Sequence, residues 1–221
     1  MSVVDLEPEP KTGFVYQSVI NSIDAMAWES LDTNEMLRVA KAYYYFSVQF
    51  RRNLEIARRL YPDDPKLLEL WKGECKTDNL SPWPGIAEPG EKMHHDEFMR
   101  RLIWLHPPIA MDEGLSSAGG KYLREVRIVD QYARAASLAS YEDGGLATVF
   151  MAMLRAKKGW DDAANRAFRH FLVSHLRFDG DHGALSRHLA VDDRILPLWM
   201  AFRDLLVYAA PKLCEWQPRS R

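Results

Sequence analysis

The sequence predicts an all-α protein that folds as a helical bundle. Apolar residues recur at spacings of three and four along nearly every long segment, as in helices that bury one face. No segment shows the strict alternation of a half-buried strand between turn residues. A length of 221 residues with 47% hydrophobic content is enough for one sizeable core. We therefore expect a single domain over residues 1–221.

The first two expected helices are separated by a capping signal. Residues 13–31 carry one apolar stripe and should form the first helix. The cluster Asp32-Thr33-Asn34 then supplies an N-cap for a long second helix. That helix should end near Tyr61, because Pro62 and Pro65 follow.

A long irregular stretch lies near the middle of the chain. A short helix over residues 66–71 should lead into it. Residues 76–90 contain three prolines and two glycines, so we expect a loop there.

The second half of the chain should contain four helices. Pro107-Pro108 ends the first of them, and Gly114 and Gly119-Gly120 predict a loop before the next. Gly159 is a suitable end for that long helix, and Pro197 is tolerated because it lies near the start of the last one. The expected ranges are residues 91–105, 121–158, 161–190 and 193–213.

Composition excludes several classes of function. The 29 basic and 31 acidic residues are interleaved, so no polybasic surface for nucleic acid is expected. No segment approaches the roughly 20 apolar residues of a membrane span, and the acidic start lacks the pattern of a signal peptide. We expect a cytoplasmic protein without a membrane or nucleic-acid partner. Cys75 and Cys214 are too few for a disulfide framework.

Three polar residues interrupt the buried stripe of the helix expected at residues 161–190. His175, Asp179 and His182 follow one another at spacings of four and three. At about 100° per residue they lie within an arc of about 60°. A buried carboxylate and two buried imidazoles all need partners, and a metal ion satisfies the three together. The alternative is a structural hydrogen-bond network.

Two other segments also place a polar residue in line with a buried apolar stripe. Glu142 falls in line with the buried stripe of its helix, immediately before Gly144 and Gly145. His95 shares a face with apolar neighbours after the Pro/Gly-rich loop. Glu88, seven residues earlier, and Glu91, four residues earlier, are rival carboxylates for the same site. Carboxylates with imidazoles suit iron or manganese better than structural zinc.

These residues resemble the heme-oxygenase-like diiron oxidases, whose third core helix carries His-x3-Asp-x2-His. The resemblance implies a heme-oxygenase-like bundle of seven to eight helices that holds two Fe(II) ions without heme, and that uses O2 and an external reductant. It assigns one iron to Glu88, His95 and His175 and the other to Glu142, Asp179 and His182.

The resemblance also implies a substrate class. Family members oxidise amino acids, fatty acids and related small molecules, and the chain most resembles the branch that desaturates an aliphatic amino acid such as isoleucine and closes it to an azetidine in nucleoside-antibiotic biosynthesis. An amino-acid carboxylate needs a cation. Arg134, Arg169 and Arg177 are the candidates, and the bundle could form a homodimer.

Two other hypotheses of function stay open. A metal-free enzyme of the same fold, such as a thiaminase-like hydrolase or a cofactorless oxidase, would need a nucleophilic cysteine or a basic pocket. A non-catalytic helical interaction protein would use the His and acidic residues as a structural network.

Overall fold

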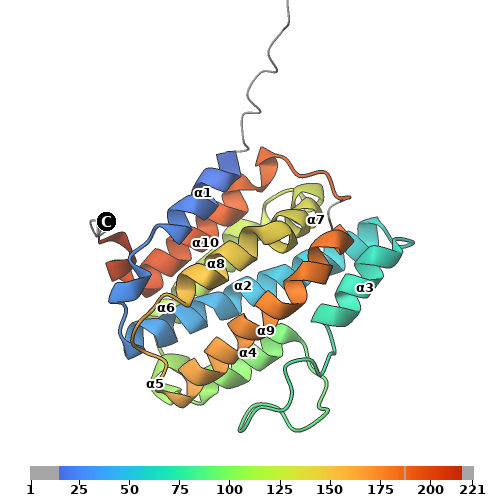
Figure 1. Cartoon of the computed structure of the whole chain (residues 1–221). Helices are drawn as coiled ribbons and strands as arrows, with labels where there is room; N and C mark the ends of the chain where they lie inside the picture. The colour runs from blue at the N-terminus through green and yellow to red at the C-terminus, as the bar shows by residue number, and fades with distance from the viewer. Residues whose placement is uncertain (1–14, 187, 216–221) are drawn as a thin grey trace, which may run out of the picture.

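The computed structural model is a bundle of helices, which confirms the all-α prediction (Figure 1). It describes residues 15–186 and 188–215, without the side chains of residues 178–186. Within that part of the chain there is no β-strand, and only two isolated backbone bridges occur, both in the loop between α3 and α4.

The α-helices follow the chain as α1 (Val15–Asp24), α2 (Thr33–Leu60), α3 (Pro65–Glu74), α4 (His95–Trp104), α5 (Pro107–Ala110), α6 (Glu113–Arg127), α7 (Gln131–Ser140), α8 (Leu146–Met153), α9 (Ala163–Ser186) and α10 (Leu196–Ala209). A π-helical segment, Tyr141–Gly145, joins α7 to α8. Short 3-10 turns lie at Trp28–Ser30, Asp193–Ile195 and Pro211–Cys214.

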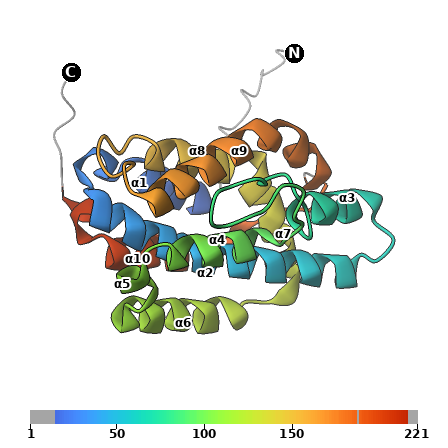
Figure 2. The same ribbon diagram turned by 90° about the horizontal axis from the view of Figure 1, so that it is seen from below.

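The long helix α2 is the centre of the bundle. It begins at the expected N-cap, where Asp32 and Glu35 form a capping box, and it ends just before Tyr61. It packs against α4, α6, α7, α9 and α10. Seen from below, α6 lies on one side of α2 and α9 on the other (Figure 2).

Aromatic side chains fill the space between these helices. The ring of Tyr43 on α2 lies 5.4 Å from that of Phe171 on α9 and 5.5 Å from that of Phe150 on α8. Phe46 packs on Phe202 of α10 at 4.4 Å. Such ring pairs add to the hydrophobic effect and hold the helices around α2.

Several of the expected helices begin or end elsewhere, as the first helix and α4 illustrate. The first stops at Asp24 and is followed by a 3-10 turn. α4 begins at His95 rather than at residue 91, because Met93 exchanges backbone hydrogen bonds with Thr77 across the loop. A residue paired in this way has an extended backbone and cannot continue a helix.

The prediction of one helix over residues 121–158 was wrong. α6 already begins at Glu113 and includes Gly119 and Gly120, which the sequence assigned to a loop. A Cβ atom at Gly119 would lie 2.2 Å from the Tyr45 ring, so this glycine allows close helix packing rather than a turn. The chain then breaks before Asp130, which caps α7, and again in the π-helical segment.

Among the described residues, none of the helices combines the length and apolar character that crossing a bilayer requires.

Candidate metal centre

Three buried side chains from three helices converge in the middle of the bundle. They are Glu74 at the end of α3, His95 at the start of α4 and His175 in α9, with exposures of 7%, 6% and 7%. His95 Nδ1 lies 2.7 Å from Glu74 Oε2 and 2.9 Å from His175 Nε2. Glu74 Oε2 and His175 Nε2 are 4.0 Å apart. This group, which we call the Glu-His-His cluster, could hold a metal ion.

The loop between α3 and α4 brings Glu74 and His95 together. Thr77 and Met93 exchange two backbone hydrogen bonds of 3.0 and 2.9 Å, so the two ends of the loop run side by side. Glu74 lies just before this bridge and His95 just after it. The bridge therefore makes neighbours of two ligand candidates that are far apart in the sequence.

The outer nitrogen of each imidazole has a hydrogen-bond acceptor. Asn79 donates its Nδ2 group to the Gly73 carbonyl at 3.0 Å, which leaves its Oδ1 atom to accept from His95 Nε2 at 3.0 Å. His175 Nδ1 lies 2.8 Å from the Phe171 carbonyl one turn earlier in α9. When the protons sit on these outer nitrogens, the inner nitrogens of both rings present their lone pairs to the cluster, as metal binding requires.

This arrangement fits a first-row divalent metal. Metal-binding histidines usually donate their second ring N–H to a carbonyl or carboxylate, as here. With bonds of about 2.1 Å, neighbouring ligand atoms of an octahedral ion are about 3.0 Å apart and opposite ones about 4.2 Å. The three observed separations of 2.7, 2.9 and 4.0 Å lie close to that pattern.

Glu142 lines the same cavity from a π-helical segment. It is buried, and it follows Tyr141 at the start of the Tyr141–Gly145 turn. Gly144 adopts a φ of 89°, a value that favours glycine, and Gly145 leaves no room for a Cβ atom beside the Ser140 carbonyl. Asp143 also leaves the helical region, with a φ of -85° and a ψ of 50°, so the helix is kinked here between α7 and α8. Here the turn delivers a carboxylate to the cavity.

The remaining wall of the cavity is mostly apolar. The cavity has a volume of ≈ 20 Å³, which suits an ion or a water molecule. Its wall is completed by Tyr43, Ser47, Phe50, Arg51, Cys75, Asp96, Leu146 and Phe171. Arg51 is bound to Asp96 at 3.0 Å and to Glu55 at 2.7 Å. Burial raises the pKa of the Cys75 thiol to about 12, with a further contribution from the charge of Glu74.

Three of the residues predicted from the sequence come together here. His95, His175 and Glu142 all line the cavity. Glu88 does not, because it is solvent-exposed in the outer part of the loop, where its carbonyl accepts from Ser81. Glu91, its rival, forms an ion pair with Arg101 at 2.8 Å. The carboxylate that the structure places beside His95 is that of Glu74.

The side chains of Asp179 and His182 lie outside the described residues. The backbone of α9 continues as a helix to Ser186. Both residues therefore keep the helical spacing from His175 on which their prediction rests.

None of the three arginines predicted to bind a substrate carboxylate lines this cavity. Arg169 and Arg177 are exposed on α9. Arg134 is buried, but it lines a different cavity, beside α6.

Glu74 and Asn79 were not predicted. The expected short helix ended at Trp71, three residues too early, so Glu74 was not considered part of it. Leu67, Leu70 and Glu74 follow one another at spacings of three and four, and all are buried. A polar residue in such an apolar stripe is the signal that identified His175. No comparable signal marks Asn79.

Comparison of the chain with protein-family models, with characterised proteins and with solved structures gives no match.

Proposed function

We propose that this protein is a non-heme iron oxidase that uses dioxygen to oxidise a small molecule. One observation carries the proposal: the buried Glu-His-His cluster, in which the inner nitrogens of His95 and His175 and the Glu74 carboxylate converge. Two histidines and one carboxylate are ligand types that non-heme Fe(II) oxygenases use, although Glu74 Oε2 and His175 Nε2, 4.0 Å apart, would lie opposite each other here rather than on one face. Structural zinc sites instead use four protein ligands and often thiolates.

Bound iron supplies one-electron redox chemistry and a binding position for dioxygen. The chain's own residues hold and shield that site. Asn79 and the Phe171 carbonyl fix the two imidazole rings. The Phe171 ring stacks on His175 with centroids 4.0 Å apart and excludes water from that side. The neutral Cys75 thiol and the apolar side chains of Phe50 and Leu146 line part of the wall, and the charges of Arg51 and Asp96 in the rest of it are paired with each other.

We also propose a second iron ion, with Glu142 as one of its ligands. Its carboxylate lines the cavity beside the Glu-His-His cluster, on the side of the π-helical segment that packs against α9. Asp179 and His182 follow His175 along α9 and complete the second ligand set inferred from the sequence. We further propose that the substrate is a small aliphatic amino acid, as the resemblance to the diiron oxidases implies.

Oxygen consumption tests the proposal. Metal-free protein is loaded with Fe(II) without oxygen and then mixed with O2 and a panel of aliphatic amino acids, while absorbance and dissolved oxygen are followed. We expect oxygen uptake above that of free Fe(II), and one substrate should accelerate it. His95→Ala should reduce the uptake to the background. Uptake equal to that of free iron in both proteins contradicts the proposal.

A pair of glutamine variants tests the assignment of the carboxylate. Glu74→Gln should lower the affinity for Fe(II) by at least about tenfold, because it removes a charged ligand. Glu88→Gln should leave the affinity unchanged, because that side chain is exposed in the loop. Isothermal titration with Fe(II) under nitrogen measures both. The reverse ranking would restore Glu88 as the ligand.

A further inference from the structure

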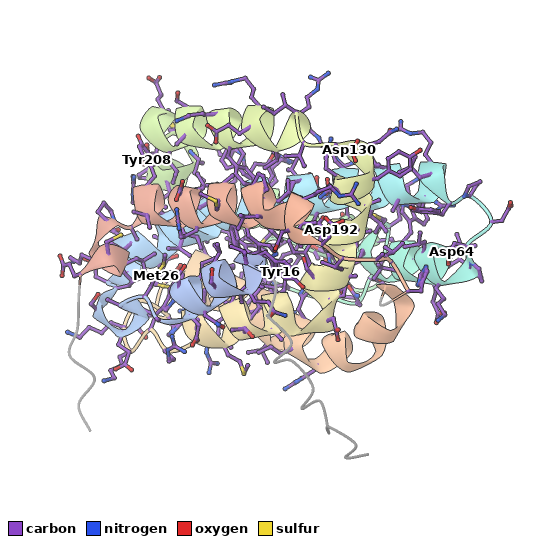
Figure 3. The ribbon with its side chains drawn as sticks, turned by 90° about the horizontal axis from the view of Figure 1, so that it is seen from above. Tyr16, Met26, Asp64, Asp130, Asp192 and Tyr208 are labelled. Atoms are coloured by element: carbon purple, nitrogen blue, oxygen red, sulfur yellow. The ribbon has the colours of Figure 1, made fainter. Side chains whose placement is uncertain are left out.

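A second cavity lies between α2, α6 and α7 and is lined by arginines. It has a volume of ≈ 350 Å³. Arg52 and Arg59 come from α2, Arg127 from the end of α6 and Arg134 from the first turns of α7. Figure 3 marks the region with Asp130, which caps α7 just after the end of α6. We call this the arginine cavity.

The arginine cavity is separate from the metal centre. Both cavities use α2, but the metal cavity uses Tyr43, Ser47 and Phe50, whereas the arginine cavity uses Gln49, Arg52, Ile56 and Arg59. At about 100° per residue these two sets lie on opposite faces of the helix. Figure 2 agrees, since α6 and α9 lie on opposite sides of α2.

Arg134 forms the floor of the arginine cavity and is only 8% exposed. Among the described residues, the one hydrogen bond of its side chain runs from Nε to Asn53 Oδ1 at 2.9 Å. Its two Nη groups are thus left for a ligand in the cavity. An arginine so deeply buried is normally paired with an acid, because burying an unpaired charge is costly.

The arginines at the mouth increase this positive charge. No described carboxylate lies within ion-pair distance of Arg52, Arg59, Arg127 or Arg134. Glu55 also lines the cavity, but its carboxylate binds Arg51 at 2.7 Å. Burial lowers the pKa of Arg134, and the charges of Arg52 and Arg127 lower it further. An anion in the cavity would relieve this repulsion.

The geometry points to a binding site for a phosphate-bearing small molecule in the arginine cavity. Four guanidinium groups exceed what a single carboxylate needs, whereas the planar fork of arginine matches phosphate oxygens. The apolar wall of Ile56, Leu123 and Val126 provides a surface for the body of the molecule. This site does not depend on the proposed oxidase activity.

Titration calorimetry at constant ionic strength tests the inference. The probes are inorganic phosphate, pyrophosphate and adenosine monophosphate, with acetate as the control anion. We expect saturable binding of the phosphate probes and none of acetate. Tighter binding of the nucleotide identifies a phosphorylated small molecule as the ligand class, whereas tighter binding of inorganic phosphate or pyrophosphate overturns the role of the apolar wall.

Single arginine substitutions test whether the phosphate probes bind in the arginine cavity. Arg134→Gln should weaken phosphate binding by at least about tenfold, because it removes the buried guanidinium. Arg127→Gln, at the exposed mouth, should weaken it severalfold without a risk to folding. Arg124→Gln is the matched control, since Arg124 is an exposed arginine of α6 that does not line this cavity. Equal affinity in all variants, or no saturable binding to the wild type, overturns the inference.

Discussion

Asn79 orients His95 of the Glu-His-His cluster and is not itself one of the three candidate ligands. Its amide is held by the Gly73 carbonyl, and its oxygen accepts from His95 Nε2 at 3.0 Å. When His95 donates its Nε2 proton in this bond, its Nδ1 lone pair faces Glu74 and His175, where a metal ion would accept it. Residues that orient ligands in this way are part of a metal site even though they are not ligands.

We predict that Asn79→Ala weakens Fe(II) binding by about 10–100-fold, the range typical of outer-shell partners of metal-bound histidines. Asn79→Asp should restore part of the affinity, because a carboxylate oxygen also accepts from His95 Nε2, although the bond to the Gly73 carbonyl is lost. Calorimetry under nitrogen measures both variants. Equal losses in Asn79→Ala and Asn79→Asp would mean that the loop conformation matters and the hydrogen bond to His95 does not.

The two cysteines should differ in reactivity. Burial raises the pKa of Cys75 to about 12, so its reactive thiolate is scarce at pH 8, whereas Cys214 is exposed. We predict that the native protein reacts rapidly with one equivalent of iodoacetamide, at Cys214. Peptide mass spectrometry identifies the modified thiol, and Cys214→Ser is the control. Rapid labelling of Cys75 would contradict its burial beside the cavity.

The same thiol should affect stability at high pH. The folded pKa of Cys75 is raised above the unfolded value of about 8.5. Its contribution is therefore complete below about pH 8.5 and is lost as the pH rises toward 12. We predict that the melting temperature falls less between pH 8 and pH 10 in Cys75→Ala than in the wild type. An identical fall in both proteins would show that Cys75 is not buried as described.

The π-helical segment depends on two glycines for different reasons. Gly144 supplies a positive φ of 89°. Gly145 supplies space, because a Cβ atom there would lie 2.1 Å from the Ser140 carbonyl oxygen and 2.9 Å from the Trp199 ring. The turn that presents Glu142 therefore requires glycine at both positions.

We predict that Gly145→Ala lowers the free energy of unfolding by about 1–3 kcal/mol, as overpacking does. Gly120→Ala in α6 is the matched control, because the nearest atom to its Cβ would be Arg124 Nη1 at 3.5 Å. That change should stabilise the protein by up to about 1 kcal/mol, since it removes a helical glycine. Urea unfolding measures both. A neutral Gly145→Ala would show that the turn tolerates a different packing.

Helix identity was easier to predict from the sequence than helix boundaries. The repeating apolar pattern and the Asp32 cap predicted α2 almost to the residue, because both signals are local. The start of α4 depends instead on backbone pairing between Thr77 and Met93. The continuation of α6 through Gly119 depends on the Tyr45 ring of another helix. Neither cause is visible within its own segment.

The site residues divide in the same way, into those with a local signal and those placed by contacts from elsewhere in the molecule. His95, His175 and Glu142 were predicted because each lies in an apolar stripe of its own helix. Glu74 was missed because its short helix runs three residues further than expected, and Glu88 was preferred for its spacing from His95. Only the folded loop determines which carboxylate approaches His95. Arg134 was predicted to bind a substrate carboxylate, but it lines a cavity on the other face of α2 from the Glu-His-His cluster.

The central claim is that Glu74, His95 and His175 bind iron, and anomalous diffraction at the iron edge tests it most directly. Crystals are grown from protein loaded with Fe(II) without oxygen. We predict a peak in the anomalous difference map between these side chains. The iron at that peak should lie about 2.1 Å from Glu74 Oε2, His95 Nδ1 and His175 Nε2. A second peak beside Glu142 would support the two-iron proposal. Density with no iron among these three side chains, or with iron held by Glu88, would contradict the account.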